Sequence, residues 1–339
     1  MARRDHGYVS LVLIVSRDEV EELLDLDALI CSLAGAMSDL SAGLASVPNR
    51  VGALVEERDG LLAAMPGFTP SSHALASKLV TLFPRNAGTA LPTHQAVIVV
   101  FDPDNGRPEA LLDGTAITAL RTGAGSALAT RLLAREDATT LAILGTGVQA
   151  RSHARAVTRV RAFKELRIAG RDPQKAEALA EELVPTLDLR VRPMRSWEEA
   201  CAGADVICAT AHALEPVVRR DWLAPGTHVT SVGYNPEGRE VDDATVAESL
   251  VVVESRAAAL APFPAGANDL LQPIERRVIS ADHVHAEVGE LVNGSKRGRT
   301  SAEQLTLYKS VGVAVQDCVA ARLVLDAARD RGAGHEVEL

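Results

Sequence analysis

The stretch Leu144-Gly145-Thr146-Gly147-Val148-Gln149-Ala150 decides the fold of this chain. An apolar run before it predicts a strand over 139–144, and the segment after it predicts a helix over 149–160. A strand, a Gly-x-Gly-x-x-Ala turn and a helix form the dinucleotide-binding fingerprint, in which the glycines allow a tight turn and a close approach of the backbone to a pyrophosphate. As an isolated match, the same letters could also mark a purely structural glycine-rich turn.

The residues after this loop favour the dinucleotide interpretation. Strands and helices alternate regularly, which is typical of a parallel sheet with crossover helices, and six such strands make a doubly wound sheet. The last of the expected helices opens with Ser196-Trp197-Glu198-Glu199, a capping-box pattern. We therefore expect a Rossmann domain that binds a nicotinamide dinucleotide through Gly145, Thr146, Gly147, Val148 and Gln149. The further strands are expected over 165–169, 189–191, 205–209, 227–232 and 250–254, and the further helices over 173–183 and 196–202.

The end of the second Rossmann strand reads Ile168-Ala169-Gly170-Arg171-Asp172-Pro173. An NAD-dependent enzyme normally places a carboxylate here, on the ribose diol. Gly170 leaves room at this point, and Arg171 can pair with a 2′-phosphate. The sequence therefore favours NADP(H), with NAD(H) possible. In the alternative interpretation Arg171 is a solvated loop residue and Asp172 caps the next helix.

The residues before the Rossmann segment predict an α+β region, and a long helix is expected near the C-terminus. That helix is expected to begin near a second capping box, Thr300-Ser301-Ala302-Glu303, with an apolar stripe from Leu305 to Leu323 that packs on the first domain. The elements expected in the first third are strands over 9–15, 50–56, 60–65, 74–83, 95–102 and 108–113 and helices over 17–24 and 27–40.

Composition narrows the class of protein. The chain has 339 residues, 47% of them hydrophobic, which is enough for about two domains with buried cores. Its net charge is −10 and its basic residues form no stripe, so nucleic acid is an unexpected partner. Four cysteines lie far apart, and the apolar run over 9–15 is too short for a signal peptide or a membrane span. We expect a cytoplasmic protein without a membrane partner.

Several blocks of sequence, in order along nearly the whole chain, resemble the ornithine cyclodeaminase and mu-crystallin family, which includes archaeal-type alanine dehydrogenases and ketimine reductases. The resemblance implies an α/β fold in which a Rossmann domain over 129–305 joins an α+β substrate-binding and dimerisation domain over 1–128 plus 306–339. It also implies a homodimer formed through a barrel-like sheet. The matching blocks are Lys78–Asn86, Leu91–Thr93, Leu112–Ala124, the Gly145 loop and Lys309–Gly312.

The resemblance also implies roles for individual residues. Arg50 and Arg121 match the arginines that hold the substrate carboxylate, a task that suits the bidentate guanidinium. Lys78 matches the catalytic lysine. Its strand is otherwise apolar, so burial would lower its pKa and allow proton transfer near neutrality, although a lysine reaching solvent from a strand edge is the alternative. Other matches are Thr93 beside the nicotinamide and substrate, and Thr210, Val232 and Gly312 along the cofactor cleft.

Asn235 departs from the family pattern, because cyclodeaminases and alanine dehydrogenases of this family usually carry an aspartate there. An asparagine can position an amine or a water but cannot accept a proton. This weakens a cyclodeaminase reading and favours reduction of a C=N bond of a small imino acid, with Asn235 as a candidate catalytic residue beside Lys78. An ornithine or lysine cyclodeaminase and a non-catalytic, mu-crystallin-like binding protein stay as alternatives. No metal site is expected, since the histidines of Asp282-His283-Val284-His285 lack a third ligand nearby in sequence.

Overall fold

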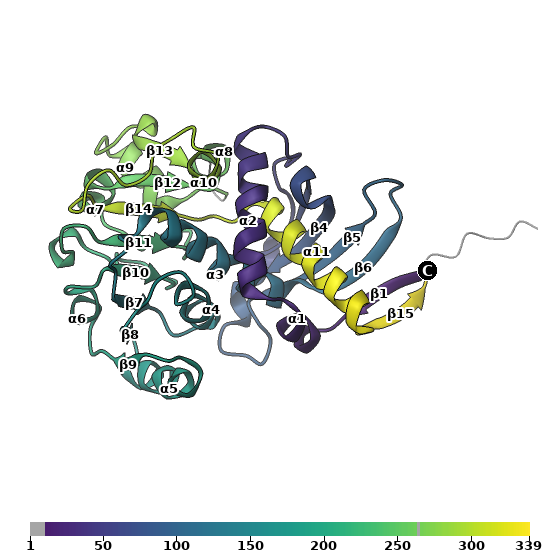
Figure 1. Cartoon of the computed structure of the whole chain (residues 1–339), viewed down its shortest axis with the longest axis horizontal. Coiled ribbons are helices and arrows are strands. Elements are labelled where there is room, and N and C mark those ends of the chain that lie inside the picture. The colour runs from purple at the N-terminus through teal and green to yellow at the C-terminus, as the bar shows by residue number, and fades with distance from the viewer. Residues whose placement is uncertain (1–10, 263–264) are drawn as a thin grey trace, which may run out of the picture.

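The computed structural model describes residues 11–262 and 265–339, and its strands form two sheets that stand side by side (Figure 1). Of the opening strand expected over 9–15, residues 9 and 10 lie outside the described residues. In spatial order the first sheet has the seven strands β15 (His335–Glu338), β1 (Leu11–Val15), β6 (Pro108–Asp113), β5 (His94–Phe101), β4 (Ala74–Leu82), β3 (Gly60–Thr69) and β2 (Val51–Val55).

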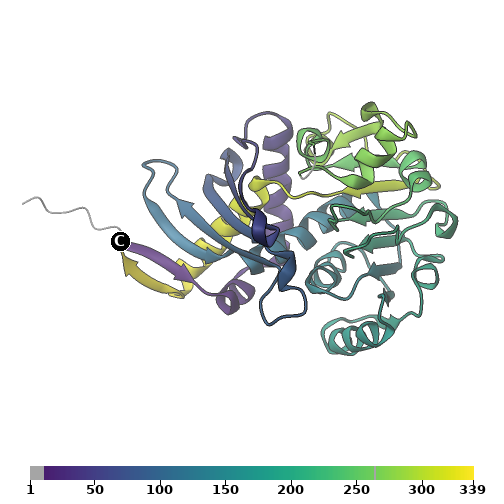
Figure 2. The same ribbon diagram turned by 180° about the vertical axis from the view of Figure 1, so that it is seen from behind.

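The seven-stranded sheet is covered by helices on one face only. Helices α2 (Leu26–Ser41) and α11 (Ala314–Arg331) lie across this face, and α1 (Arg17–Leu23) packs at its side (Figures 1 and 2). Antiparallel pairing places Met65, Lys78 and Ile98 opposite one another on neighbouring strands, and all three are buried. Lys78, the charged residue of an otherwise apolar strand, is therefore buried in the core beneath α11.

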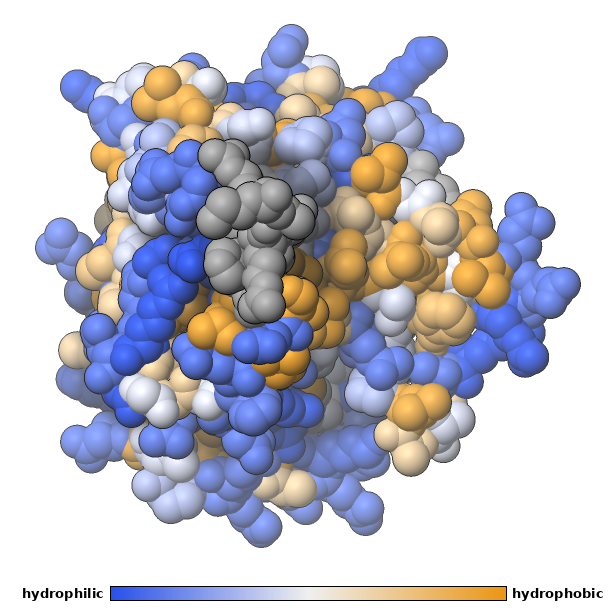
Figure 3. All heavy atoms as spheres, turned by 90° about the vertical axis from the view of Figure 1, so that its right-hand side faces the viewer, coloured by the Kyte–Doolittle hydropathy of each residue, from blue (hydrophilic) through white to orange (hydrophobic). Residues whose placement is uncertain are grey.

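The opposite face of this sheet is uncovered and apolar. Val51, Ala64, Leu79 and Val97 follow one another across four neighbouring strands in register. Three of these side chains, together with Leu62, are exposed hydrophobic residues. Figure 3 shows hydrophobic surface gathered on this side of the molecule. Burial of such a row by a second protein surface would be favourable.

The second sheet is parallel throughout and has eight strands, two more than the sequence predicted. The central strand β7 ends at Leu144, directly before the glycine loop, and the chain changes direction across the sheet between β7 and β10. Its spatial order is β13 (Val284–Glu287), β12 (Leu250–Val253), β14 (Thr306–Lys309), β11 (His228–Ser231), β10 (Val206–Ala209), β7 (Thr140–Leu144), β8 (Glu165–Ala169) and β9 (Arg190–Pro193).

Helices cover both faces of the parallel sheet, and one of the two cores is shared with the first sheet. Leu141 and Ile143 face a core that continues through α3 and α11 to Ile98 of the first sheet. Ala142 and Leu144 face a second core on the other side. The remaining helices are α3 (Gly114–Leu133), α4 (Val148–Val157), α5 (Pro173–Leu183), α6 (Trp197–Cys201), α7 (Asp243–Glu248), α8 (Arg256–Ala259), α9 (Asn268–Glu275) and α10 (Val288–Val292).

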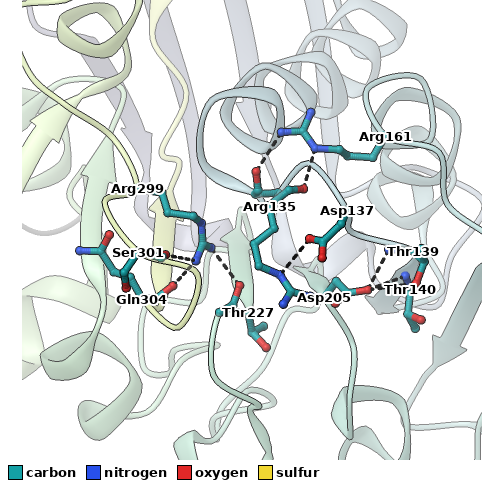
Figure 4. Close-up of polar contacts among 12 residues, drawn as sticks. Arg135, Asp137, Thr139, Thr140, Arg161, Asp205, Thr227, Arg299, Ser301 and Gln304 are labelled. Atoms are coloured by element: carbon teal, nitrogen blue, oxygen red, sulfur yellow. Dashed lines mark hydrogen bonds and ion pairs between the residues drawn. The ribbon is translucent and has the colours of Figure 1, made fainter.

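Helix α3 connects the two sheets, and partly buried polar contacts fix its C-terminal end. Arg161 donates hydrogen bonds to the carbonyl oxygens of Ala134 and Arg135, and Arg299 donates one to the carbonyl oxygen of Leu133. The side chain of Arg135 in turn pairs with Asp205 at the start of the parallel sheet (Figure 4). Cations at the end of a helix satisfy its last carbonyl groups, so these arginines stabilise the C-terminal end of α3 beside the parallel sheet.

Three local predictions differ from the structure. The C-terminal helix does not start near Thr300; the chain first forms β14 and α11 then begins at Ala314. A buried strand of a parallel sheet is apolar on both faces, and so the spacing of Leu305, Tyr308 and Val311 imitated a helix. Helix α3 is absent from the elements expected from the sequence, and β3 runs on to Thr69 instead of ending at residue 65. Because β14 belongs to the parallel sheet, we propose to move the second domain boundary from 305/306 to a point after Lys309.

None of the helices within 11–262 and 265–339 combines the length and apolar character needed to cross a membrane. Ser196 caps α6 through the backbone amide of Glu199 at 3.1 Å, while the Glu199 carboxylate bonds the amide of Arg195. The capping pattern in the sequence therefore marked the start of a real helix.

Candidate active site

The glycine loop closes tightly against the neighbouring strand β10. Gly145 has a φ of +140°, and a Cβ built on it would lie 2.4 Å from Oγ1 of Thr210. The backbone amide and the hydroxyl of Thr210 both donate to the carbonyl oxygen of Leu144, at 2.9 and 3.1 Å. A side chain at position 145 would push the two strand ends apart, so the expected tight turn is a steric requirement here. Thr210 supports the loop from the next strand.

The next residues of the loop leave an open cradle at the start of α4. A Cβ on Gly147 would meet no atom within 4 Å, and no side chain caps the helix that follows. Val148 is exposed, while Oε1 of Gln149 is buried and has no hydrogen-bond partner among the described residues. Uncapped amides at a helix N-terminus attract an anion, and the missing Cβ lets a bulky group approach the backbone. The arrangement fits the pyrophosphate of a dinucleotide.

The neighbouring loop after β8 carries Gly170 and Arg171. A Cβ on Gly170 would come within 2.7 Å of the Thr146 side chain, so the two loops touch. Asp172 accepts a hydrogen bond from the Gln174 amide at 3.0 Å and thereby caps α5, while Arg171 is exposed. The capping part of the alternative interpretation is thus present. It leaves the guanidinium of Arg171 available at the edge of the cradle.

A buried cluster of opposite charges lies beneath α11, where the first sheet meets α3. Nζ of Lys78 lies 2.8 Å from Oδ2 of Asp317, and Nε of Arg121 lies 3.1 Å from Oδ1 of the same carboxylate. Arg121 also donates from Nη1 to Oε1 of Gln316 at 2.8 Å. Burial, opposed by the nearby Asp317 carboxylate, lowers the pKa of Lys78 to about 8. A lysine in this state can exchange a proton close to neutral pH.

The loop between β14 and α11 brings this cluster to the parallel sheet. Glu254, at the end of β12, accepts hydrogen bonds from Ser310 Oγ and from the amides of Val311 and Gly312, all between 2.8 and 2.9 Å. Arg50 donates to the carbonyl oxygen of Gly312 at 3.1 Å. Burial, with Arg121 as a further cause, lowers the pKa of Arg50. Two arginines and a lysine therefore converge beside the carboxyl edge of the parallel sheet.

The loop after β11 forms another wall at the same edge. Oδ1 of Asn235 accepts hydrogen bonds from the amides of Glu237 and Gly238, at 2.9 and 3.1 Å, so this side chain stabilises its own turn. Nδ2 of Asn268 bonds the carbonyl oxygen of Asn235 at 2.9 Å. Burial raises the pKa of Tyr234, in the same loop, and the positive charge of Arg50 opposes this increase.

A buried network of charged residues stabilises the loop that follows β11. Nζ of Lys309 lies 2.8 Å from Oδ2 of Asp269 and donates to the carbonyl oxygen of Gly233 at 2.9 Å. Glu240 accepts hydrogen bonds from the Gly233 amide at 2.8 Å and from Ser231 Oγ at 2.7 Å. Burial raises the pKa of Glu240 to about 7. Lys309, which the sequence placed in a motif block, is therefore a structural support of the loop.

The other expected residues occupy supporting positions. Val232 directly follows β11, and its amide bonds the Ala209 carbonyl oxygen at 3.1 Å. Thr93 lies just before β5, with Oγ1 3.4 Å from Nδ1 of His94, and has no recorded contact with the charged cluster. Nε2 atoms of His283 and His285 each lie 2.9 Å from a backbone carbonyl oxygen. No group of three or more metal-ligating side chains comes together within the described part of the chain.

Sequence reasoning missed three residues of the site: Gln316, Asp317 and Glu254. Asp317 is 1% exposed, although it lies in a helix whose neighbouring residues are apolar. The signal was available, since Gln316-Asp317 interrupts the apolar run Val313-Ala314-Val315 and Cys318–Ala321. A polar pair in the middle of a buried helical segment requires a partner, and here the partners are the site's cations.

Comparison with known proteins agrees with this geometry. The sequence model described as "Ornithine cyclodeaminase/mu-crystallin family" matches residues 11–332. The ketimine reductase mu-crystallin of Mus musculus is 38% identical over 317 residues, which cover 92% of this chain and 96% of the relative. The structure of Thermococcus litoralis Delta(1)-pyrroline-2-carboxylate reductase in complex with NADH and L-proline has a TM-score of 0.91 at 38% identity, covering 96% of this chain and all of that one. An archaeal alanine dehydrogenase dimer with bound NAD has a TM-score of 0.88 at 28% identity, covering 96% and 99% of the two chains.

Proposed function

Because the chain belongs to the ornithine cyclodeaminase/mu-crystallin family, we propose that it reduces the C=N bond of a small cyclic ketimine carboxylate. It is an NAD(P)-dependent oxidoreductase that acts on the C–N bond of an imino or amino acid. The observation that carries the narrower proposal is the buried group of Lys78, Arg121 and Asp317 beside Gly312. This group combines a carboxylate-binding cation with one proton-exchanging amine. Gly312 follows β14 and the dinucleotide cradle follows β7, so both lie at the carboxyl edge of the same parallel sheet.

The residues divide the work by their chemistry. Arg121 and Arg50 are placed to bind the substrate carboxylate, because the guanidinium groups of both lie against Gly312. Lys78 is placed to give a proton to the imine nitrogen or its product. The bound nicotinamide would supply the hydride. Reduction needs no further acid or base from the chain. The reaction therefore does not require Asn235, whose side chain is already bonded within its own turn.

The dinucleotide is proposed to be NADPH in preference to NADH. Gly170 leaves the end of β8 without a carboxylate, and exposed Arg171 follows it directly. A carboxylate there would bind the ribose diol and repel a 2′-phosphate, whereas a guanidinium attracts the phosphate. The glycine loop that holds the pyrophosphate does not distinguish the two cofactors, so NADH can also bind. The solved relatives named above hold NADH and NAD.

Cyclodeamination is the competing reaction for this site. Its proton transfers would call for a carboxylate where Asn235 stands, and the amide oxygen of Asn235 is already engaged by Glu237 and Gly238. We therefore propose that Asn235 shapes its loop rather than moving a proton. A cyclodeaminase would release ammonia from ornithine without net change in nicotinamide absorbance, and a mu-crystallin-like binding protein would give no turnover.

We propose a cytoplasmic homodimer that forms through the uncovered face of the seven-stranded sheet. A continuous row of Val51, Leu79 and Val97 is exposed there, and the face has the pattern expected of a buried sheet surface. The alanine dehydrogenase of similar fold is itself a dimer. All four cysteines are free, which suits a reducing compartment.

The proposal is tested by following nicotinamide absorbance with purified protein and a panel of substrates. The panel holds 1-pyrroline-2-carboxylate, its six-membered homologue, pyruvate with ammonia, pyruvate with methylamine, and ornithine with NAD⁺. We expect the cyclic ketimines to give the highest kcat/KM. Lys78→Met should lower kcat by about 10²- to 10⁴-fold, as for loss of a positioned acid or base.

Lys164→Met is the matched control, because Lys164 is exposed and lies at the far end of the parallel sheet. It should leave turnover unchanged. Ammonia release from ornithine without nicotinamide turnover would replace the proposal by cyclodeamination. Full activity of Lys78→Met would remove the proposed proton donor.

A further inference from the structure

The carboxylate of Asp317 joins two cations that come from different parts of the chain. Its Oδ2 lies 2.8 Å from Nζ of Lys78 on β4, and its Oδ1 accepts a hydrogen bond from Nε of Arg121 on α3. Asp317 itself lies in the first turn of α11 and is 1% exposed. One buried carboxylate thus connects the expected proton donor with the expected carboxylate-binding residue.

The ion pair with Lys78 and the hydrogen bond from Arg121 fix how these cations face the site. Arg121 is held at Nε by Asp317 and at Nη1 by Gln316, while Nη2 has no hydrogen-bond partner among the described residues. Two hydrogen bonds fix the orientation of the planar guanidinium group, and so its remaining donors have a defined direction. The side chain of Lys78 has a flexible four-carbon stem, so its ammonium group depends on Asp317 for a fixed position.

The carboxylate of Asp317 also opposes the other effects on the pKa of Lys78. Burial, Arg121 and Arg50 all lower the pKa of Lys78, whereas Asp317 raises it through its charge and its hydrogen bond. The remaining titratable groups near the ammonium are His94, whose pKa Lys78 helps to lower, and Cys318, whose thiol has a pKa raised to about 12 by burial. Without the carboxylate, two arginines and a dry environment would favour a neutral amine.

We propose that Asp317 is a positioning residue of this site, which orients Arg121 toward the substrate carboxylate and keeps Lys78 protonated and in place. The proposal rests on the proposed reductase function for its kinetic consequences. Its effect on the protonation of Lys78 does not depend on turnover, so the two can be tested separately.

The first experiment measures the protonation of Lys78 directly. The chain has only five lysines, of which Lys78 and Lys309 are buried. In protein labelled with ¹³C at lysine Cε, Lys78→Met identifies the Lys78 resonance by its loss. The NMR titration midpoint of Lys78 should lie near pH 8 in the native protein. In Asp317→Asn it should be lower by about 1 to 3 pH units, as expected when a close opposite charge is removed.

The second experiment measures the same variant kinetically. Asp317→Asn should raise KM for the ketimine about tenfold or more, because the hydrogen bond from Nε of Arg121 loses its charged acceptor. The basic limb of the kcat/KM profile for reduction should move to lower pH together with the NMR midpoint. Asp326→Asn is the matched control, since Asp326 lies on the same helix and pairs with Arg322. It should alter neither quantity.

A folded Asp317→Asn protein with an unchanged Lys78 midpoint would overturn the protonation role, and an unchanged KM would overturn the orienting role. If Asp317→Asn does not fold, Asp317→Glu decides, because it keeps the charge and moves it by one methylene. It should hold the Lys78 midpoint near 8 while raising KM; a midpoint as low as that of an unpaired lysine would contradict the proposal. Native protein without ketimine turnover would refute the proposed function, yet the NMR titration would still judge Asp317.

Discussion

Gly312 lies against the guanidinium of Arg121 so closely that a Cβ built on the glycine would stand 2.8 Å from Nη2 and 2.9 Å from Nη1. Arg121 cannot simply move aside, because Asp317 holds its Nε and Gln316 holds its Nη1. The backbone of Gly312 also has a φ of +75°, which disfavours any side chain. The glycine of the Lys309–Gly312 block therefore acts as the spacer that lets the loop between β14 and α11 touch Arg121, the residue proposed to bind the substrate carboxylate.

Gly312→Ala should therefore impair substrate binding more than folding. A displacement of Arg121 by about 1 Å can lower kcat/KM by up to about 100-fold, while the left-handed backbone costs about 1 kcal/mol of stability. Steady-state kinetics and urea denaturation separate the two effects. Gly332→Ala is the control, because Gly332 has a φ of +62° with nothing within 4 Å of a Cβ. Equal kcat/KM in both variants would contradict the spacer role.

The dinucleotide loop could be predicted because its signal is local. Strand, glycine turn and helix lie within a short stretch, and each part constrains the next. The contact of Asp317 with Arg121 spans 196 positions of sequence and carries no local pattern of its own. It depends on how α11 packs on the first sheet, which no spacing rule describes. Sequence resemblance supplied Lys78 and Arg121 but not the residue that joins them.

The misplaced C-terminal helix and the missed α3 have a common physical cause. β14 is buried on both faces in the middle of a parallel sheet, so its residues lack the alternation that marks a half-exposed strand. α3 is buried almost all round by α2, α4 and α11, so it lacks a polar stripe. Periodicity reports a difference between two faces, and elements without an exposed face give no such difference.

Arg171→Ala should weaken the preference for NADPH. Removal of a guanidinium that pairs with the 2′-phosphate should raise KM for NADPH about 10- to 100-fold and leave KM for NADH within about twofold, as charged hydrogen bonds of this kind predict. The check is kcat/KM for both cofactors at fixed ketimine. Arg190→Ala is the control, because this exposed arginine begins β9 at the amino ends of the strands, whereas Arg171 follows the carboxyl end of β8. An identical cofactor ratio in Arg171→Ala and native protein would refute the 2′-phosphate contact.

The pH dependence of turnover should follow Lys78. Its ammonium loses a proton as the pH rises through about 8. Reduction consumes a proton, so kcat/KM in that direction should be constant below pH 8 and fall above it, while oxidation of the cyclic amino acid should increase over the same range. Initial rates in both directions test this. Lys78→Arg stays charged throughout, so any basic limb left in that variant belongs to the substrate; an unchanged limb would exclude Lys78 as its origin.

Leu62→Arg should separate the proposed dimer. Leu62 lies on the uncovered face of the seven-stranded sheet and is 42% exposed in the single chain. Burying an unpaired guanidinium in an apolar interface is costly, so sedimentation should show a monomer at micromolar concentration. Val184→Arg, at a 56% exposed valine of the Rossmann region, should leave the mass unchanged. A native chain that sediments as a monomer, or a dimeric Leu62→Arg protein, would exclude this face.

His153 should make the fold sensitive to acid. Burial lowers its pKa from 6.5 to about 4, and its nitrogens contact the Gln149 carbonyl oxygen and Ser126 Oγ at 2.7 and 2.9 Å. Between pH 6.5 and 4 the unfolded chain binds the proton and the folded chain does not. Stability is therefore complete above pH 6.5 and falls as the pH decreases, by about 3 kcal/mol over that window.

His153→Gln should remove this part of the acid sensitivity, because glutamine does not titrate. Its free energy of unfolding in urea should fall about 3 kcal/mol less between pH 7 and pH 4 than that of the native protein. His335→Gln, at an exposed histidine, should behave like the native chain. Since His153 joins α4, which carries the dinucleotide cradle, to Ser126 of α3, which carries Arg121, cofactor affinity of the native protein should decline over the same acid range. Parallel pH curves for native and His153→Gln proteins would show that the α3–α4 contact does not depend on a neutral imidazole.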